Sequence, residues 1–165
     1  MTTRRVNGNR KRRASGSAIA EFGPALGIIL ICFFFPTIDM LAVGMSYGFV
    51  MVLNNNQVHE ASLVPASNAS DPSGMVKKGI PDQWKAGMGH FVNMTGSPVT
   101  DITYRDGTTE SDGVKNATVT VKTTVVCNPF LPIPLPFANV PGLNGPMTFA
   151  IQSERPMENP DDPNQ

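Results

Sequence analysis

The sequence predicts an α+β protein, in which a long N-terminal helix precedes a small exported domain with one short helix and a three- or four-stranded antiparallel sheet. The helix is expected to be transmembrane in its first half and amphipathic in its second. Three observations lead there: an apolar stretch with no charge from Phe22 to Ile38, alternating β-branched residues in the C-terminal half, and a basic leader. The basic leader holds Arg4, Arg5, Arg10, Lys11, Arg12 and Arg13.

The charge of the chain is distributed unevenly about the apolar stretch. The whole chain has 13 basic and 13 acidic residues, and no acidic residue precedes Glu21. By the positive-inside rule, the N-terminus stays cytoplasmic and the C-terminal part is exported. Removal of residues 1–16 takes six basic residues, leaving seven against 13 acidic ones, a net charge of −6. A basic run can also bind nucleic acid, but a membrane-length segment directly after it favours a topology signal and a lipid bilayer partner, with no nucleic acid.

One helix is expected over residues 17–62. About 20 apolar residues at 1.5 Å each cross a hydrocarbon core of ~30 Å, so residues 22–41 fit one span. The following residues become polar from Asn54 to Glu60, which predicts an amphipathic second half outside the membrane. Pro36 removes one backbone hydrogen bond and predicts a kink or local unwinding near residues 33–36.

The exported part begins after a segment rich in Ser, Pro, Gly and Asn. Residues 63–80 are expected to be a linker. A short amphipathic helix then starts at Pro81 and places Trp84, Met88 and Phe91 on one face. The small domain is expected over residues 81–153, and the acidic, proline-rich residues 154–165 form a disordered tail.

Three segments have the pattern of strands. They are residues 99–105, which end at an Asp106–Gly107 turn, residues 116–126, and residues 147–153. The second alternates cleanly between two faces. One face holds Val119, Val121, Thr123 and Val125, and the other holds Thr118, Thr120, Lys122 and Thr124.

A proline-rich segment separates the last two strands, with prolines at positions 129, 132, 134, 136, 141 and 146. These prolines forbid a central strand. The segment is either a loop that covers the sheet or an exposed arm for a partner subunit, and dense apolar residues are usually covered. The apolar residues of this candidate arm are Phe130, Ile133, Leu135 and Phe137.

No set of residues predicts an active site. Ser46 in GMSYG matches a Gly-x-Ser-x-Gly motif formally, but it lies in an apolar helix rather than on a strand-to-helix turn. His59, Glu60 and His90 offer no convincing third metal ligand. We therefore expect no enzyme, no catalytic residue, no metal and no cofactor. Cys32 lies in the expected membrane segment and Cys127 in the exported part, so the two cannot form a disulfide with each other. Cys127 is expected to be either buried or free for intermolecular pairing.

Small residues recur in the apolar helix at a spacing that allows close helix packing. Gly23 with Gly27, and Gly44 with Gly48, form two Gly-x-x-x-Gly pairs. Such pairs let membrane helices approach closely, although chance matches are common in glycine-rich segments.

The junction at Gly16 and Ser17 carries the most specific pattern. The basic leader ends in Gly16, SAIAEF follows with Glu21 and Phe22 at the fifth and sixth positions after the glycine, and a long apolar helix begins. This arrangement resembles the cleavage motif of type IVb prepilins of the tight-adherence (Flp/Tad) pilus. With its exported domain, the chain is similar to the TadE-like minor pilins (pseudopilins) of that system.

The resemblance implies that a prepilin peptidase cuts after Gly16, which makes Ser17 the new N-terminus. It implies a role in pilus assembly and adherence. The partners would be other pilin subunits, major and minor, and an inner-membrane pilus assembly platform. The location would be the bacterial inner membrane with the C-terminal domain in the periplasm, or the extracellular pilus. Glu21 and Phe22 would set the register between subunits, because a carboxylate in a membrane helix needs a partner such as a neighbour's freed α-amino group.

Three points stay open at this stage. Asp39 departs from the family pattern, and it either marks the outer membrane interface or pairs with a basic group on another subunit. The small residues Ala42 and Gly44 also fit a signal-peptide cleavage site, which would release a secreted binding protein. An uncleaved single-pass anchor that presents a periplasmic binding domain is the third interpretation.

Overall fold

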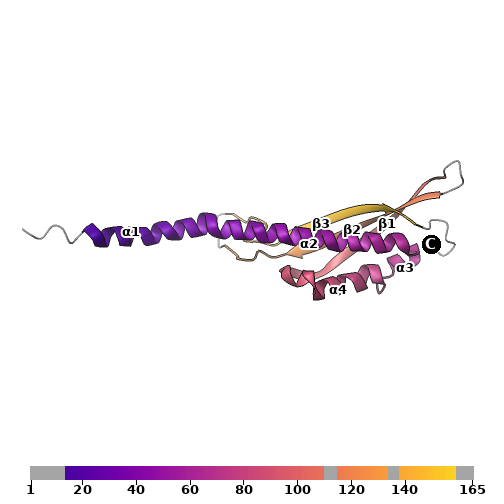
Figure 1. The fold of residues 1–165 in the computed structure, drawn as a ribbon, viewed down its shortest axis with the longest axis horizontal. Helices are drawn as coiled ribbons and strands as arrows, with labels where there is room; N and C mark the ends of the chain where they lie inside the picture. Colours follow the sequence, from indigo (N-terminus) through magenta and orange to yellow (C-terminus); the bar gives the residue numbers. More distant parts are fainter. Residues whose placement is uncertain (1–13, 110–114, 134–137, 159–165) are drawn as a thin grey trace, which may run out of the picture.

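The computed structural model describes residues 14–109, 115–133 and 138–158. It is an α+β protein: a long apolar helix followed by a small domain with short helices and a three-stranded antiparallel sheet. Figure 1 shows the N-terminal half of the helix projecting from the molecule, while the sheet and the short helices lie along its C-terminal half.

The long helix consists of α1 (Ala14–Ile29), the π-helix η1 (Leu30–Phe34) and α2 (Phe35–Leu63). Its residues Ala20–Leu63 are long and apolar enough to cross a membrane, with a mean hydropathy of 2.3 in an 18-residue window. This confirms the expected long helix, which begins slightly earlier than residue 17.

Pro36 is accommodated by a change of helix type rather than a break. The Phe35 N–H bonds to the Leu30 carbonyl five residues back, and the Thr37 hydroxyl donates to the Phe33 carbonyl at 2.7 Å. A wider turn before a proline relieves the clash of its ring with the preceding turn. The unwinding expected at residues 33–36 therefore lies mainly in η1, and the ribbon keeps one general direction through it (Figure 1).

The sheet has the order β1-β2-β3, formed by β1 (Met94–Thr109), β2 (Lys115–Cys127) and β3 (Met147–Pro156). The predicted alternation of β2 is confirmed, because Val119, Val121, Thr123 and Val125 are all buried. The predicted turn at Asp106–Gly107 is wrong. Asp106 pairs with Ala117, and a register shift between Asp106 and Thr109 keeps Gly107 within the strand.

Strand β1 also begins earlier than expected, at Met94. A second register irregularity between Thr95 and Val99 contains Gly96, at φ +79°, and Pro98. Both residues are tolerated because β1 is an edge strand, where a bulge and a missing N–H leave the sheet intact.

The segment between α2 and β1 is more helical than the sequence indicates. Residues 63–80, expected to be a linker, contain α3 (Ala66–Ser70) and the π-helix η2 (Met75–Gly79). Helix α4 (Ile80–Ala86) has Pro81 in its first turn but ends before Gly87, and a 3-10 turn, η3 (Met88–Phe91), follows. The expected helix face is thus broken: Trp84 is buried, whereas Met88 and Phe91 are exposed.

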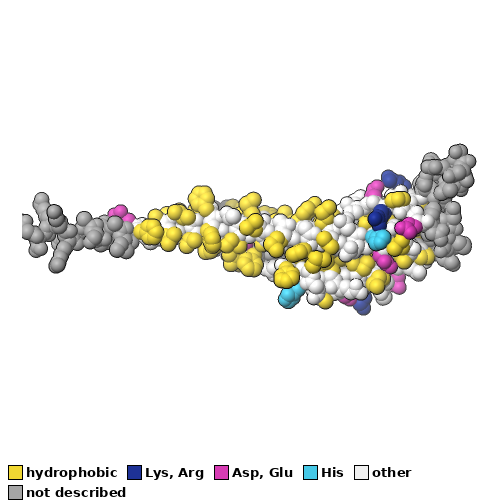
Figure 2. All heavy atoms as spheres, viewed as in Figure 1, with side chains coloured by type: hydrophobic (Ala, Val, Ile, Leu, Met, Phe, Trp, Pro, Cys, Tyr) yellow, Lys and Arg dark blue, Asp and Glu magenta, His cyan; other side chains and the backbone are white. Residues whose placement is uncertain are grey.

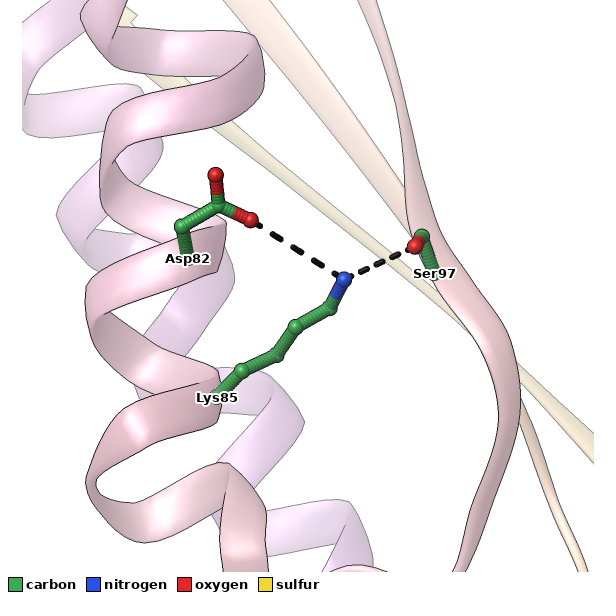
Figure 3. A network of polar contacts seen from close by, with 3 residues as sticks. All are labelled: Asp82, Lys85 and Ser97. Atoms are coloured by element: carbon green, nitrogen blue, oxygen red, sulfur yellow. Dashed lines mark hydrogen bonds and ion pairs between the residues drawn. The ribbon is translucent and has the colours of Figure 1, made fainter.

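Trp84 attaches α4 to α2 and packs against the turn that follows α4. Its indole N–H donates to the Phe49 carbonyl at 3.0 Å, and Gly89 lies so close to the ring that a Cβ at this position would come within 2.5 Å of it. Lys85, one position on, donates from Nζ to the Ser97 hydroxyl at 2.7 Å, with Asp82 4.0 Å away (Figure 3). Exposed pairs of this kind contribute under about 1 kcal/mol, so the Trp84 contact is the stronger attachment of α4.

Two apolar clusters join α2 to the sheet. The first contains Val50, Leu53, Trp84, Val92, Val125, Cys127, Phe149 and Ile151. The second contains Val58, Ala61, Ala69, Val76, Ala117, Val119, Val121 and Met157. The folded domain therefore extends beyond its predicted end at residue 153, because β3 continues to Pro156 and Met157 is buried. Residues 159–165 of the predicted tail lie outside the described residues.

A buried polar layer lies between the two clusters, made of Asn54, Gln57, Thr100 and Thr123. Asn54 Nδ2 donates to the carbonyls of Val121 and Ile151 at 2.9 and 3.2 Å, and also to the Thr123 hydroxyl at 3.0 Å. These polar residues of α2 face the sheet, and Met51 and Val52 are exposed instead. The second half of α2 is therefore amphipathic, as expected: Asn55, Asn56 and His59 are exposed, whereas Asn54 and Gln57 belong to the buried face with Val50, Leu53 and Val58.

Candidate membrane and assembly surface

The junction predicted to be processed lies in the first turn of α1. Gly16 and Ser17 have helical backbone within Ala14–Ile29, and residues 1–13 of the leader lie outside the described residues. Glu21 and Phe22 follow one turn later and are exposed, Phe22 at 66%. The junction therefore leads directly into a helix face that its own chain does not cover.

The exposed apolar surface of the helix begins at Phe22. It continues with Leu26, Ile28, Ile29, Ile31, Phe33 and Phe34, which are 41–69% exposed. Only 6% of the most apolar window is buried inside the chain. Figure 2 shows this projecting half as a mainly hydrophobic surface, while most of the charged side chains visible on this face gather at the opposite end of the molecule. Such a stretch requires lipid or another protein around it.

The same kind of surface extends beyond the expected span. Met40 and Leu41, at the end of that span, are 71% and 65% exposed, and Met45, Met51 and Val52, beyond it, are 37–59% exposed. From Phe22 to Val52 the helix measures about 45 Å, which exceeds a hydrocarbon core of ~30 Å. The exposed apolar surface is therefore about 15 Å longer than the hydrocarbon core of one bilayer.

The four glycines predicted to pack against other helices lie on open surface. A Cβ added at Gly23, Gly27, Gly44 or Gly48 would meet no atom within 4 Å. Gly44 and Gly48 are exposed, whereas Ser46 and Val50 of the same helix face the domain. The chain itself thus leaves room beside each glycine for the backbone of a second helix.

Asp39 is engaged within the chain. Its side chain is fully buried, and its Oδ1 accepts a hydrogen bond from the Leu131 N–H at 2.8 Å. The second oxygen, Oδ2, is buried without a hydrogen-bond partner among the described residues. Neither interpretation from the sequence included this contact. It attaches the proline-rich segment to α2, although Leu131 and Asp39 are 92 residues apart in the sequence.

We call residues 128–146 the strap; residues 134–137 of it lie outside the described residues. Of the candidate arm, Ile133 is buried against the rest of the chain, whereas Phe130 is 63% exposed. Leu135 and Phe137 of that arm lie outside the described residues. Gly142, at φ +85°, approaches α2 so closely that a Cβ would lie 3.2 Å from Val43. The strap therefore lies against α2 near Asp39 and Val43.

Replacement of Asp39 should loosen the strap. Asp39→Ala removes the acceptor of the Leu131 N–H and should lower the free energy of unfolding by about 1–2 kcal/mol. Asp39→Asn keeps an acceptor oxygen and should cost less. Limited proteolysis of the full chain in detergent measures the effect as faster cleavage within residues 128–146 in the alanine variant. Equal cleavage rates in all three chains would contradict this role of Asp39.

The remaining chemical candidates do not form a site together. Ser46 is buried in the middle of α2, His59 contacts the Arg155 guanidinium, and the ring of His90 lies against that of Phe91. Within the described residues, no group of three or more His, Cys, Asp or Glu side chains could hold a metal ion. Cys127 is buried, and burial raises the pKa of its thiol to about 11.

Comparison with known proteins adds no family to these observations. No protein-family model matches the chain, and no curated protein or solved structure gives a significant match. Function is therefore inferred from the junction, the exposed helix and the contacts of the strap.

Proposed function

We propose that this chain is a minor pilin (pseudopilin) of a bacterial tight-adherence type IVb pilus. A prepilin peptidase cuts it after Gly16, and the helix anchors it in the inner membrane with the C-terminal domain in the periplasm. The chain then acts in pilus assembly and adherence by packing its helix against other pilin subunits. In this proposal it is a building part of the pilus and a peptidase substrate, not an enzyme.

One observation carries the proposal. The pattern of basic leader, Gly16, Glu21 and Phe22 leads directly into an apolar helix that is 6% buried in its most apolar window. A core helix of a soluble protein would be mostly buried in its own chain. A membrane anchor alone would need about 30 Å of apolar surface, whereas this helix exposes about 45 Å. The surplus favours a helix that packs against other subunits.

The contacts of α2 with the domain disfavour an ordinary signal peptide. A signal peptidase cut after Gly44 would remove Asp39, whose Oδ1 accepts the Leu131 N–H, and Val43, which lies against Gly142. A domain that had to function after such a cut would not be expected to depend on the removed residues. Cleavage at Gly16 keeps both contacts.

Glu21 has a defined role in this proposal. A carboxylate near the start of a membrane helix is costly in hydrocarbon and favours a nearby positive charge. The α-amino group freed at Ser17 of a neighbouring subunit supplies that charge when two helices pack with an axial stagger. Glu21 then sets the register between subunits, next to Phe22.

A charge-specific series at Glu21 tests this role. Glu21→Ala and Glu21→Gln should leave cleavage after Gly16 and membrane anchoring intact but reduce incorporation into pili at least tenfold, since the positive charge would be left unpaired. Glu21→Asp keeps the charge and should retain part of the incorporation into pili. Immunoblots of sheared pili and of membranes measure the two pools. Normal incorporation of the glutamine variant would show that the charge of Glu21 is not needed.

A further inference from the structure

The end of the domain that faces the projecting helix carries almost no charge. Residues 123–153 contain no Asp, Glu, Lys, Arg or His, and within the strap and η3 the one ionisable side chain is His90. The opposite end holds Arg105, Glu154 and Arg155, and most of the charged side chains visible in Figure 2 lie toward that end. The small domain thus has a charged distal end and a proximal end whose surface carries almost no charge, since the nearby Asp39 carboxylate of α2 is fully buried.

The proximal end also exposes large apolar side chains. We define the proximal rim as Met40, Phe91 and Phe130, which are 71%, 75% and 63% exposed. Phe91 and Phe130 share a small cavity with Ala42, Val43 and Ser46 of α2, and the Phe91 ring also lies 6.3 Å from that of Phe49, so Phe91 extends from the level of Ser46 toward that of Phe49. Beside them lies an open hollow of about 290 Å³ lined by Met40, Val43, Val140, Pro141, Leu143 and Met147.

The level of this rim matches the outer boundary of the expected span. Phe22 to Leu41 accounts for a hydrocarbon core of ~30 Å. Ala42 to Ser46 then lie about 1.5 to 7.5 Å further along the helix, which is the depth of one headgroup region. Apolar side chains such as Phe, Trp and Leu are favoured at the boundary between headgroups and acyl chains.

We propose that the proximal rim and the adjoining hollow form a seat for the lipid leaflet on the domain's side of the membrane. Phe91, Phe130 and Met40 enter the boundary between headgroups and acyl chains, and the hollow receives an acyl-chain segment. The Asp39–Leu131 hydrogen bond holds the strap in position for this contact. The domain consequently rests on the membrane at a fixed depth instead of moving freely above it. This inference rests on the membrane span in the proposed function.

Spin labels on the full chain in phosphatidylcholine/phosphatidylglycerol nanodiscs test the seat. A nitroxide at Phe130→Cys, in a Cys32→Ala background, reports the rim, and Thr103→Cys on exposed β1 is the matched control. Cys127 should not be labelled at pH 7, because it is buried and its thiol pKa is about 11. Unchanged Trp84 emission in each variant verifies the fold.

For the label at position 130, the collision rate with oxygen, which concentrates in lipid, should be several-fold higher than the collision rate with a water-soluble nickel chelate. For the label at position 103, the collision rate with the nickel chelate should be the higher of the two. Access of the nickel chelate to position 130 equal to that at position 103 would overturn the seat and leave the rim for a protein partner. Native Cys32, which is exposed on the helix, separates the two proposals. If a label there also meets the nickel chelate, the membrane span itself is wrong, and the seat with it.

Discussion

Gln57→Ala should destabilise the domain by roughly 3 kcal/mol, although glutamine in a helix usually faces water. Gln57 is fully buried, and its Nε2 donates to the Val76 carbonyl at 2.7 Å and to the Thr100 hydroxyl at 2.8 Å. Its Oε1 accepts from the Thr123 hydroxyl at 2.7 Å. Truncation removes one hydrogen-bond partner from each of three groups, the Val76 carbonyl and the hydroxyls of Thr100 and Thr123. It also opens a cavity between α2 and the sheet.

Asn56→Ala is the matched control for Gln57→Ala. Asn56 is the adjacent residue of the same helix and is exposed, so its loss should change the free energy of unfolding by less than about 0.5 kcal/mol. Urea unfolding of the full chain in detergent, followed by the emission of Trp84, measures both variants. Equal stability of the two would contradict the buried polar layer.

Gly48→Leu should prevent incorporation into pili while the fold stays intact. A Cβ at Gly48 meets nothing within 4 Å of the chain, and leucine has a higher helix propensity than glycine, so the free energy of unfolding should be unchanged or slightly higher. In a pilus, the larger side chain would keep a neighbouring helix from approaching closely. We expect at least a tenfold loss of the chain from sheared pili.

A graded series makes the glycine prediction specific. Gly48→Ala adds one methyl group and should keep most of the incorporation, and Gly44→Leu should act like Gly48→Leu because the two glycines lie one turn apart on the exposed side. Membrane levels of each variant control for expression. Full incorporation of both leucine variants would show that this side of α2 does not pack closely against another subunit.

Local patterns in the sequence predicted the features that depend on neighbouring residues. The long helix follows from an uninterrupted apolar stretch, and the buried face of β2 follows from its period of two. The prediction of a turn at Asp106–Gly107 was wrong because a register shift in the β1–β2 pair keeps Gly107 within the strand. Such a shift depends on both paired strands and cannot be predicted from the sequence of one of them.

The polar layer and the Asp39 contact depend on residues far apart in the chain. Asn54 bonds to Val121 and Ile151, and Asp39 to Leu131, across separations of 67 to 97 residues. One local signal for the layer was present. Asn54 and Gln57 share a helical face with Val50 and Leu53 at spacings of three and four residues, which places them toward the same core.

The N-terminal residue of the chain recovered from membranes tests the central claim most directly. In cells with an active prepilin peptidase, Edman sequencing or intact mass should identify Ser17 as the first residue. An inactive peptidase, or a Gly16→Leu variant, should instead leave residues 1–16 in place. Recovery of Met1 or Thr2 from cells with the active peptidase, or of a chain that begins near Met45, would contradict the account of this protein as a pilin.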